Sequence, residues 1–149
     1  MFPTLIYPTF NIRLKEGKGK TLFVFDVIRK KWLLLTPEEW VRQHVVNYLI
    51  YEKGYPLSLI SLEKEIELNG NRKRYDVVVY TKQLTPEIII ECKSPEIPLS
   101  EKVLEQALRY NLILKVNYVF ITNGLNDFTY HNNTALADLP SYQDLFGSN

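Results

Sequence analysis

Cysteine and histidine are scarce in this sequence, and both shortages limit the sites that it can form. The 149 residues include one cysteine, Cys92, and two histidines. One cysteine excludes an internal disulfide and a multi-cysteine zinc site, and two scattered histidines supply no Ser-His-Asp set. We therefore expect any bound metal to be a hard cation held by oxygen atoms.

Long apolar runs and low-complexity segments are also missing. The longest apolar runs, such as 32–35, are far shorter than the roughly 20 residues of a membrane helix, and residues 1–4 lack the layout of a signal peptide. We therefore expect a cytoplasmic protein without a membrane partner. The six glycines and eight prolines are few, and 46% of the residues are hydrophobic, which excludes disordered and collagen-like chains.

The net charge is close to zero, at +1. Such a chain has no general electrostatic attraction to nucleic acid, so any binding must come from a local cluster of basic residues. The candidate clusters are Lys15 with Lys18 and Lys20, then Arg29-Lys30-Lys31, and then Arg72-Lys73-Arg74. Short runs of charge also occur as solvated turns, and this alternative stays open for each cluster.

The first helix has a well-defined start. Thr36 can cap it, Pro37 suits the first helical position, and Glu39 follows the cap by three residues, where it completes a capping box. Apolar residues then recur at helical spacing. Glu38 falls seven residues before a member of this apolar stripe, so we expect Glu38 to face inward.

The remaining pattern predicts an α/β fold with a mixed central sheet flanked by helices. Residues 11–15 and 22–26 alternate apolar and polar around a glycine-bearing loop, which predicts an N-terminal hairpin. The other expected elements are a helix over 36–53, strands over 62–68, 75–81 and 88–93, a helix from Ser100, a strand over 118–122, and an edge strand with a short helix in the tail. We expect one domain over 1–149, with a hairpin extension over 1–35, a core over 36–130 and a tail over 131–149.

Three charged residues are expected at one end of the central strands. Side chains alternate along a strand, so Glu91 and Lys93 project from the same side. If the strands over 75–81 and 88–93 form a hairpin, Asp76 lies across from Glu91 and Lys93. Two carboxylates from neighbouring strands suit Mg²⁺, and the lysine can orient a water molecule or help to deprotonate it. This combination favours hydrolysis of a phosphodiester over acyl or glycosyl transfer.

The same residues also allow a structural interpretation. Glu91 can pair with Lys93, and Asp76 with Arg74, at the end of the sheet. Burial of a charged triad costs roughly several kcal/mol unless other interactions offset the cost, and a metal with a substrate would do so. Both interpretations stay open at this point.

Four segments resemble the PD-(D/E)xK nuclease superfamily and, more narrowly, the N-terminal nuclease domain of type I restriction enzyme R subunits. They are Thr36-Pro37-Glu38-Glu39-Trp40-Val41-Arg42-Gln43, Arg74-Tyr75-Asp76-Val77-Val78-Val79, Ile90-Glu91-Cys92-Lys93-Ser94-Pro95 and Gln106-Ala107-Leu108-Arg109-Tyr110. The resemblance implies that Asp76, Glu91 and Lys93 bind Mg²⁺ and catalyse cleavage. It also implies that Gln106 and Tyr110 lie beside the site, which agrees with their shared face of the second helix.

The first helix and the residue before Asp76 are less regular parts of the resemblance. An acid on the first helix often completes the metal site in this superfamily, and the candidates are Glu38 and Glu39, with Gln43 as a substitute. The family has a proline before the acid of the second strand, and this sequence has Tyr75 there.

The function implied is that of a Mg²⁺-dependent DNA endonuclease, with Mn²⁺ as an alternative metal. Arg72, Lys73 and Arg74 would hold DNA phosphates. The sequence has no phosphate-binding loop, so we expect ATP-driven translocation to need separate restriction-system subunits, and self-association is a further way to assemble. Two alternatives are a non-catalytic DNA-binding or assembly module with the nuclease fold, and a structural protein whose acids form internal ion pairs.

Overall fold

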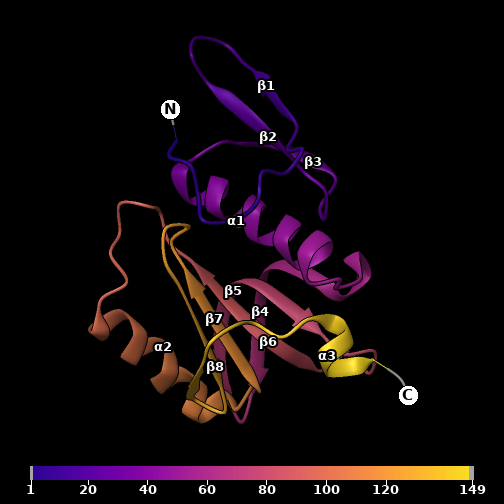
Figure 1. Ribbon diagram of the computed structural model, residues 1–149, viewed down its shortest axis with the longest axis vertical. Helices are drawn as coiled ribbons and strands as arrows, with labels where there is room; N and C mark the ends of the chain where they lie inside the picture. The colour runs from indigo at the N-terminus through magenta and orange to yellow at the C-terminus, as the bar shows by residue number, and fades with distance from the viewer. Residues whose placement is uncertain (1, 148–149) are drawn as a thin grey trace.

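The computed structural model describes residues 2–147, which form two β-sheets and three α-helices (Figure 1). In chain order the elements are β1 (Leu14–Glu16), β2 (Leu22–Asp26), β3 (Lys31–Leu34), α1 (Pro37–Asn47), β4 (Ile60–Leu68), β5 (Asn71–Tyr80), β6 (Pro86–Cys92), α2 (Glu101–Leu114), β7 (Tyr118–Thr122), β8 (Asp127–His131), β9 (Thr134–Leu136) and α3 (Tyr142–Phe146). A π-helical turn, Tyr48–Glu52, continues α1. No helix among residues 2–147 is long and apolar enough to cross a membrane.

The N-terminal sheet has three antiparallel strands, with β2 between β1 and β3. The expected hairpin is confirmed, but it gains a third strand that the sequence pattern does not predict. The pattern misses β3 because Trp32-Leu33-Leu34 shows no alternation of apolar and polar residues. The connecting turn is formed by the Asp26 carboxylate, which accepts hydrogen bonds from the N–H groups of Ile28 and Arg29 at 2.8 and 2.9 Å.

The first helix begins as expected, but its acids are placed differently. The Thr36 hydroxyl accepts a hydrogen bond from the Glu39 N–H at 3.1 Å, whereas the Glu39 carboxylate accepts one from Gln43 Nε2 at 3.0 Å. Glu39 is buried and the Glu38 side chain is 47% exposed, so the prediction that Glu38 faces inward is wrong. All of residues 41–47 are buried. Burial therefore extends around α1 well beyond the apolar stripe and reaches Glu39.

The central sheet has the strand order β4-β5-β6-β7-β8-β9, in which β6 and β7 are parallel and the other neighbours antiparallel. α2 connects β6 to β7 and covers one face, while α1 covers the other (Figure 1). Ile88 and Ile90 pack on the α1 side and Ile89 on the α2 side, so β6 is buried on both faces as its continuous apolar run predicts. The α/β fold class, the element order and the tail with its strands and short helix are confirmed.

β4 and β5 exchange faces beside the end of β6. Residues an even number of positions apart on a regular strand face the same side. In the core next to α1 lie Leu62 and Val77. In the core next to α2 lie Ile66 and Tyr75. The exchange occurs at Glu63 and Asp76, and Glu63 has a left-handed backbone with a φ of 49°. Asp76 therefore belongs to neither core, and its side chain is available at the end of the sheet.

Candidate active site

Asp76 lies where β5 and β6 separate. The pairing of β5 with β6 ends at Val77 and Ile90, the residues next to Asp76 and Glu91. Beyond it, Asp76 Oδ2 accepts a hydrogen bond from the Cys92 N–H at 2.8 Å, in place of a main-chain acceptor. Burial raises the pKa of the Asp76 carboxyl, and the Cys92 N–H and the Arg42 guanidinium, 3.8 Å from Oδ1, lower this pKa only in part.

Asp76→Asn should stabilise the fold at pH 7. The pKa of Asp76 is higher in the folded chain than its ordinary value of 3.8, so the ionised form costs free energy of folding at every pH above the folded pKa. This cost disappears below the unfolded pKa, where Asp76 is protonated in both states. Thermal unfolding followed by circular dichroism should give the variant the higher midpoint at pH 7, with the two midpoints converging toward about pH 4. A lower midpoint for the variant at pH 7 would contradict a raised pKa of Asp76 in the folded chain.

Glu91 and Lys93 line one cavity together with α2. The cavity has a volume of about 190 Å³ and is lined by Lys73, Glu91, Lys93, Val103, Gln106, Ala107 and Tyr110. Gln106 and Tyr110 are one helical turn apart, so both present their polar tips from the same face of α2. Asp76 lies beside this cavity and does not line it. It is near enough to Glu91 for the negative charge of Glu91 to raise the Asp76 pKa.

Lys73 lies inside this cavity, where the sequence pattern does not place it. Its Nζ is 2.5 Å from Glu91 Oε1, and it lies 4.6 Å from the ring centroid of Tyr75 and 5.0 Å from that of Tyr110. With a strand expected only from residue 75, residues 72–74 were predicted to form a basic turn before it, and this prediction is wrong because β5 begins earlier, at Asn71. Alternation along the strand directs Lys73 to the α2 side.

Arg72 and Arg74 are separated from the cavity by the same alternation. Arg72 Nε is 3.2 Å from Glu67 Oε2 in an exposed pair. Arg74 Nε donates a hydrogen bond to the main-chain carbonyl of Glu63 at 3.1 Å. DNA binding by residues 72–74 stays a prediction, and only Lys73 of the three is placed against the site.

A second group of charges lies on the α1 side of Asp76, and Arg42 is at its centre. The guanidinium of Arg42 lies 3.4 Å from Glu39, 3.2 Å from Glu63, and 3.8 Å from both Glu38 and Asp76. Its Nε and Nη1 are buried without a hydrogen-bond partner among the described residues. Glu38 and Glu39 thus contact Arg42 next to Asp76, and their metal-binding role stays a prediction.

Sequence reasoning did not single out Arg42 or Glu63 as parts of this group. The spacing of Arg42 three residues after Glu39 was an available signal, because such residues are neighbours on a helix. Glu63 gave no comparable signal, since its position depends on an irregular backbone in the middle of β4.

The carboxylates do not gather into one cluster. Among residues 2–147, no three His, Cys, Asp or Glu side chains lie close enough together to hold a metal ion. A hard cation at the end of β5 and β6 would therefore take its protein carboxylates from Asp76 and Glu91 and complete its coordination with water or main-chain oxygen, as Mg²⁺ commonly does. Both carboxylates are hard oxygen donors that suit such a cation, which would compete for them with Arg42 and Lys73 respectively.

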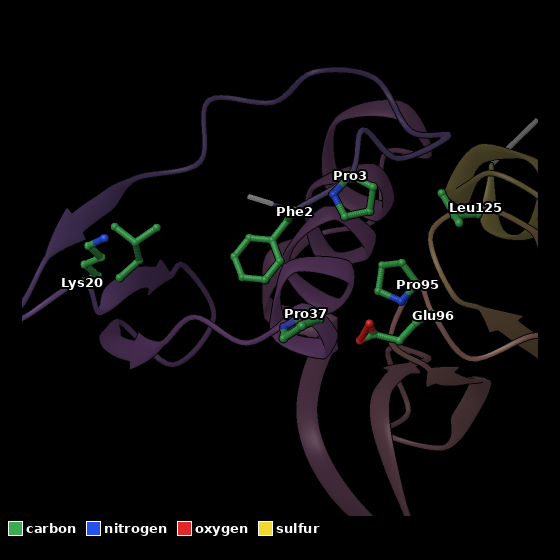
Figure 2. A pocket seen from close by; sticks show the side chains of 8 residues that line it. Phe2, Pro3, Lys20, Pro37, Pro95, Glu96 and Leu125 are labelled. Atoms are coloured by element: carbon green, nitrogen blue, oxygen red, sulfur yellow. The ribbon is translucent and has the colours of Figure 1, made fainter.

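A larger cavity, of about 760 Å³, lies between the N-terminal segment and the loop after β6 (Figure 2). Its lining residues are Phe2, Pro3, Lys20, Leu22, Pro37, Pro95, Glu96 and Leu125. None of them is predicted to bind the metal or to catalyse cleavage, and most are apolar. This cavity lies next to the candidate active site, because Pro95 and Glu96, which line it, follow Lys93 closely in the chain.

Solved structures that resemble this fold include the following two. The first is a fragment of a protein assigned as the HsdR subunit of a type I restriction enzyme from Vibrio vulnificus YJ016, with 22% sequence identity and a TM-score of 0.56. The likeness covers 75% of this chain and 25% of that one, so this chain spans a quarter of the fragment. The second is a protein assigned as a nuclease of the group DUF820 from Anabaena variabilis ATCC 29413, with 15% identity, a TM-score of 0.47, and coverage of 89% of this chain and 93% of that chain. The Vibrio likeness shows a shared fold.

The sequence itself matches a family model. Residues 37–145, from the start of α1 into α3, match the type I restriction enzyme R protein N terminus (HSDR_N). A search of curated proteins finds no match. The resemblance found in the sequence motifs is thereby confirmed: the chain belongs to the family of type I restriction enzyme R protein N termini.

Proposed function

We propose that this chain is a Mg²⁺-dependent DNA endonuclease of the cytoplasm, and that Mn²⁺ can replace Mg²⁺. The observation that carries the proposal is the placement of Glu91, Lys93, Gln106 and Tyr110 around one cavity directly beside Asp76. An acid pair with a lysine suits the hydrolysis of a phosphodiester, and the family supports a nuclease.

Asp76 and Glu91 would hold the cation. Their carboxylates come from neighbouring strands at the point where β5 and β6 separate, and both are hard oxygen donors. When bound, the metal lowers the pKa of a water molecule and stabilises the negative charge that develops on the phosphate.

Lys93 would position the attacking water and help to remove its proton. The water oxygen forms a bond to phosphorus, one bridging P–O bond breaks, and the leaving oxygen takes up a proton, which yields a phosphate monoester and a hydroxyl. In this role Lys93 starts as the neutral amine, takes the proton of the water, and as the resulting ammonium offsets negative charge on the transition state. Gln106 and Tyr110 would contact the DNA strand from α2. Arg72, Lys73 and Arg74 would bind the phosphates of that DNA.

Lys73 competes with a metal for Glu91. Because the Lys73 ammonium lies 2.5 Å from the Glu91 carboxylate, it competes with a divalent cation for that oxygen. Lys73→Met should therefore tighten Mg²⁺ binding by about tenfold, since it removes the competing charge and keeps most of the side-chain volume. Isothermal titration of Mg²⁺ checks this, with Arg72→Met as the exposed control. Weaker Mg²⁺ binding by Lys73→Met would contradict the competition.

Supercoiled and linear DNA with Mg²⁺ or Mn²⁺ tests the proposed function. The chain should nick the supercoiled form, and EDTA should stop the reaction. Because the chain spans a quarter of the Vibrio fragment, DNA and separate restriction subunits, or a second copy of the chain, are the partners that we propose. Absence of cleavage by the chain, both alone and with these subunits, would contradict the proposal.

A second candidate is a non-catalytic DNA-binding or assembly module that keeps the nuclease fold. One observation favours it, because Asp76 and Glu91 already have Arg42 and Lys73 as cationic partners. Such a module would bind DNA without turnover, and a divalent metal would leave its thermal unfolding unchanged. The nuclease is expected to melt at a higher temperature with Mg²⁺ than with EDTA.

A further inference from the structure

Positive charge is concentrated in the N-terminal sheet and the segments next to it. The chain has a net charge of +1, yet residues 11–35 contain only two acids. The basic residues in this range are Arg13, Lys15, Lys18, Lys20, Arg29, Lys30 and Lys31. One of the two acids, Asp26, is fully buried and accepts a hydrogen bond from Arg29 Nε at 2.6 Å. The exposed charge of this region is therefore almost entirely positive.

The two faces of the N-terminal sheet differ in character. Residues directly opposite one another on antiparallel strands share a face, as do residues two apart along a strand. One face holds Leu14, Val24 and Leu33, which are paired with one another, and Val24 is completely buried. The opposite face holds Arg13, Lys15, Phe23, Phe25, Trp32 and Leu34. We call this second set the basic aromatic face.

The basic aromatic face is open to solvent and ordered by its own contacts. Arg13 and Lys15 are exposed, the three aromatic rings are partly exposed, and Leu34 is 53% exposed. The Arg13 guanidinium lies 4.6 Å from the Phe25 ring centroid and 5.4 Å from that of Trp32. Lys15 Nζ lies 4.3 Å from the Trp32 ring centroid. The rings hold these two cations in place, which lowers the entropy cost of binding an anion through them.

We infer that the basic aromatic face binds a single strand of DNA. Cations that follow the phosphates, combined with aromatic rings on which unpaired bases stack, are the two elements of single-strand recognition. A duplex would use the charges but offers no unpaired base to stack on Phe25 or Trp32, since its bases are stacked on each other. The inference deepens the proposed function and rests on it for DNA as the polyanion.

The family match begins at residue 37, so the N-terminal sheet lies outside the matched part of the chain. Lys20, in the loop between β1 and β2, lines the larger cavity opposite Pro95 and Glu96 (Figure 2). Leu22, which also lines this cavity, is on the Val24 side of the sheet, so the basic aromatic face is on the other side and is a surface separate from the candidate active site.

Fluorescence tests the inference without any catalytic step. Trp32 and Trp40 are the two tryptophans, so Trp40→Phe leaves Trp32 as the reporter. In EDTA and low salt, an oligothymidylate should quench Trp32 emission by stacking on it. A duplex of the same length should bind at least about fivefold more weakly than the oligothymidylate. Absence of quenching, or duplex binding as tight as single-strand binding, would overturn the inference.

Charge variants provide a second measurement by fluorescence anisotropy of labelled oligothymidylate. Arg13→Glu with Lys15→Glu should weaken binding by about tenfold or more, and Trp32→Leu by about fivefold or more. The matched control, Lys82→Glu with Lys115→Glu, changes two exposed lysines elsewhere on the molecule and should weaken binding less than threefold. Equal losses in the control would overturn the inference. Cleavage in Mg²⁺ is assayed separately, so loss of the proposed function leaves this binding result interpretable.

Discussion

Lys93→Met should lower the rate of Mg²⁺-dependent DNA cleavage by about a hundred- to a thousand-fold, which is the effect of removing one well-placed electrostatic group from an active site. Lys93 lines the cavity with Glu91, Gln106 and Tyr110, whereas Asp76 lies beside it. Methionine keeps the length of the side chain and removes its charge. Because Lys93 is expected to act on water and on the transition state, the affinity for Mg²⁺ should change little.

Single-turnover cleavage of a labelled duplex measures this effect, with metal affinity determined separately. Lys102→Met is the matched control, because Lys102 is an exposed lysine on α2 outside the cavity lining. The control should cleave within about twofold of the wild-type rate. Equal rates for Lys93→Met and the control would remove Lys93 from the mechanism. A large loss of thermal stability in Lys93→Met would instead support the structural ion pair as the role of this lysine.

Arg42→Met should lower the free energy of unfolding by about 3–5 kcal/mol, as expected when one partner of a buried ionic group is removed. The Arg42 side chain is 8% exposed and lies between Glu39, Glu63 and Asp76. Methionine preserves the packing of the aliphatic stem but removes the cation that all three carboxylates share, which leaves Glu39 and Glu63 with Arg29 at 3.9 and 2.9 Å. Such a loss is a large part of the roughly 5–15 kcal/mol that stabilises a typical domain.

Urea unfolding at pH 7 checks the prediction for Arg42. The control is Arg72→Met, because Arg72 is 66% exposed and pairs with Glu67 at the surface. This control should change the free energy of unfolding by only about 0–1 kcal/mol. A change below about 1 kcal/mol for Arg42→Met would show that the network around Arg42 contributes little to stability.

The sequence allowed the central part of the site to be predicted because strand and helix periodicities determine it. The continuous apolar run of β6 ends at Glu91, so the charges that follow are placed at the end of a buried strand. The family resemblance placed Gln106 and Tyr110 beside Glu91 and Lys93, their spacing puts them on one face of α2, and all four line one cavity. Asp76 was expected across from Glu91, and it reaches the Cys92 N–H of the same strand.

The parts that escaped prediction depend on irregular backbone or on packing from several elements. Lys73 was placed in a turn because the start of β5 was expected later than Asn71. Glu38 was expected inside, but Glu39 is the buried acid, because burial around α1 extends beyond one stripe. The exchange of faces at Glu63 and Asp76 follows from a left-handed residue inside a strand, which no periodic pattern indicates.

The cation site that we propose at Asp76 and Glu91 is central to the proposed hydrolysis, so its occupancy is the first quantity to measure. Titration of Mn²⁺, followed by the electron paramagnetic resonance signal of the free ion, compares the wild type with Asp76→Asn combined with Glu91→Gln. The wild type should bind Mn²⁺, and the double variant should bind it at least about a hundredfold more weakly. Equal binding by the two proteins, or no binding by either, would contradict a metal-dependent site at these carboxylates.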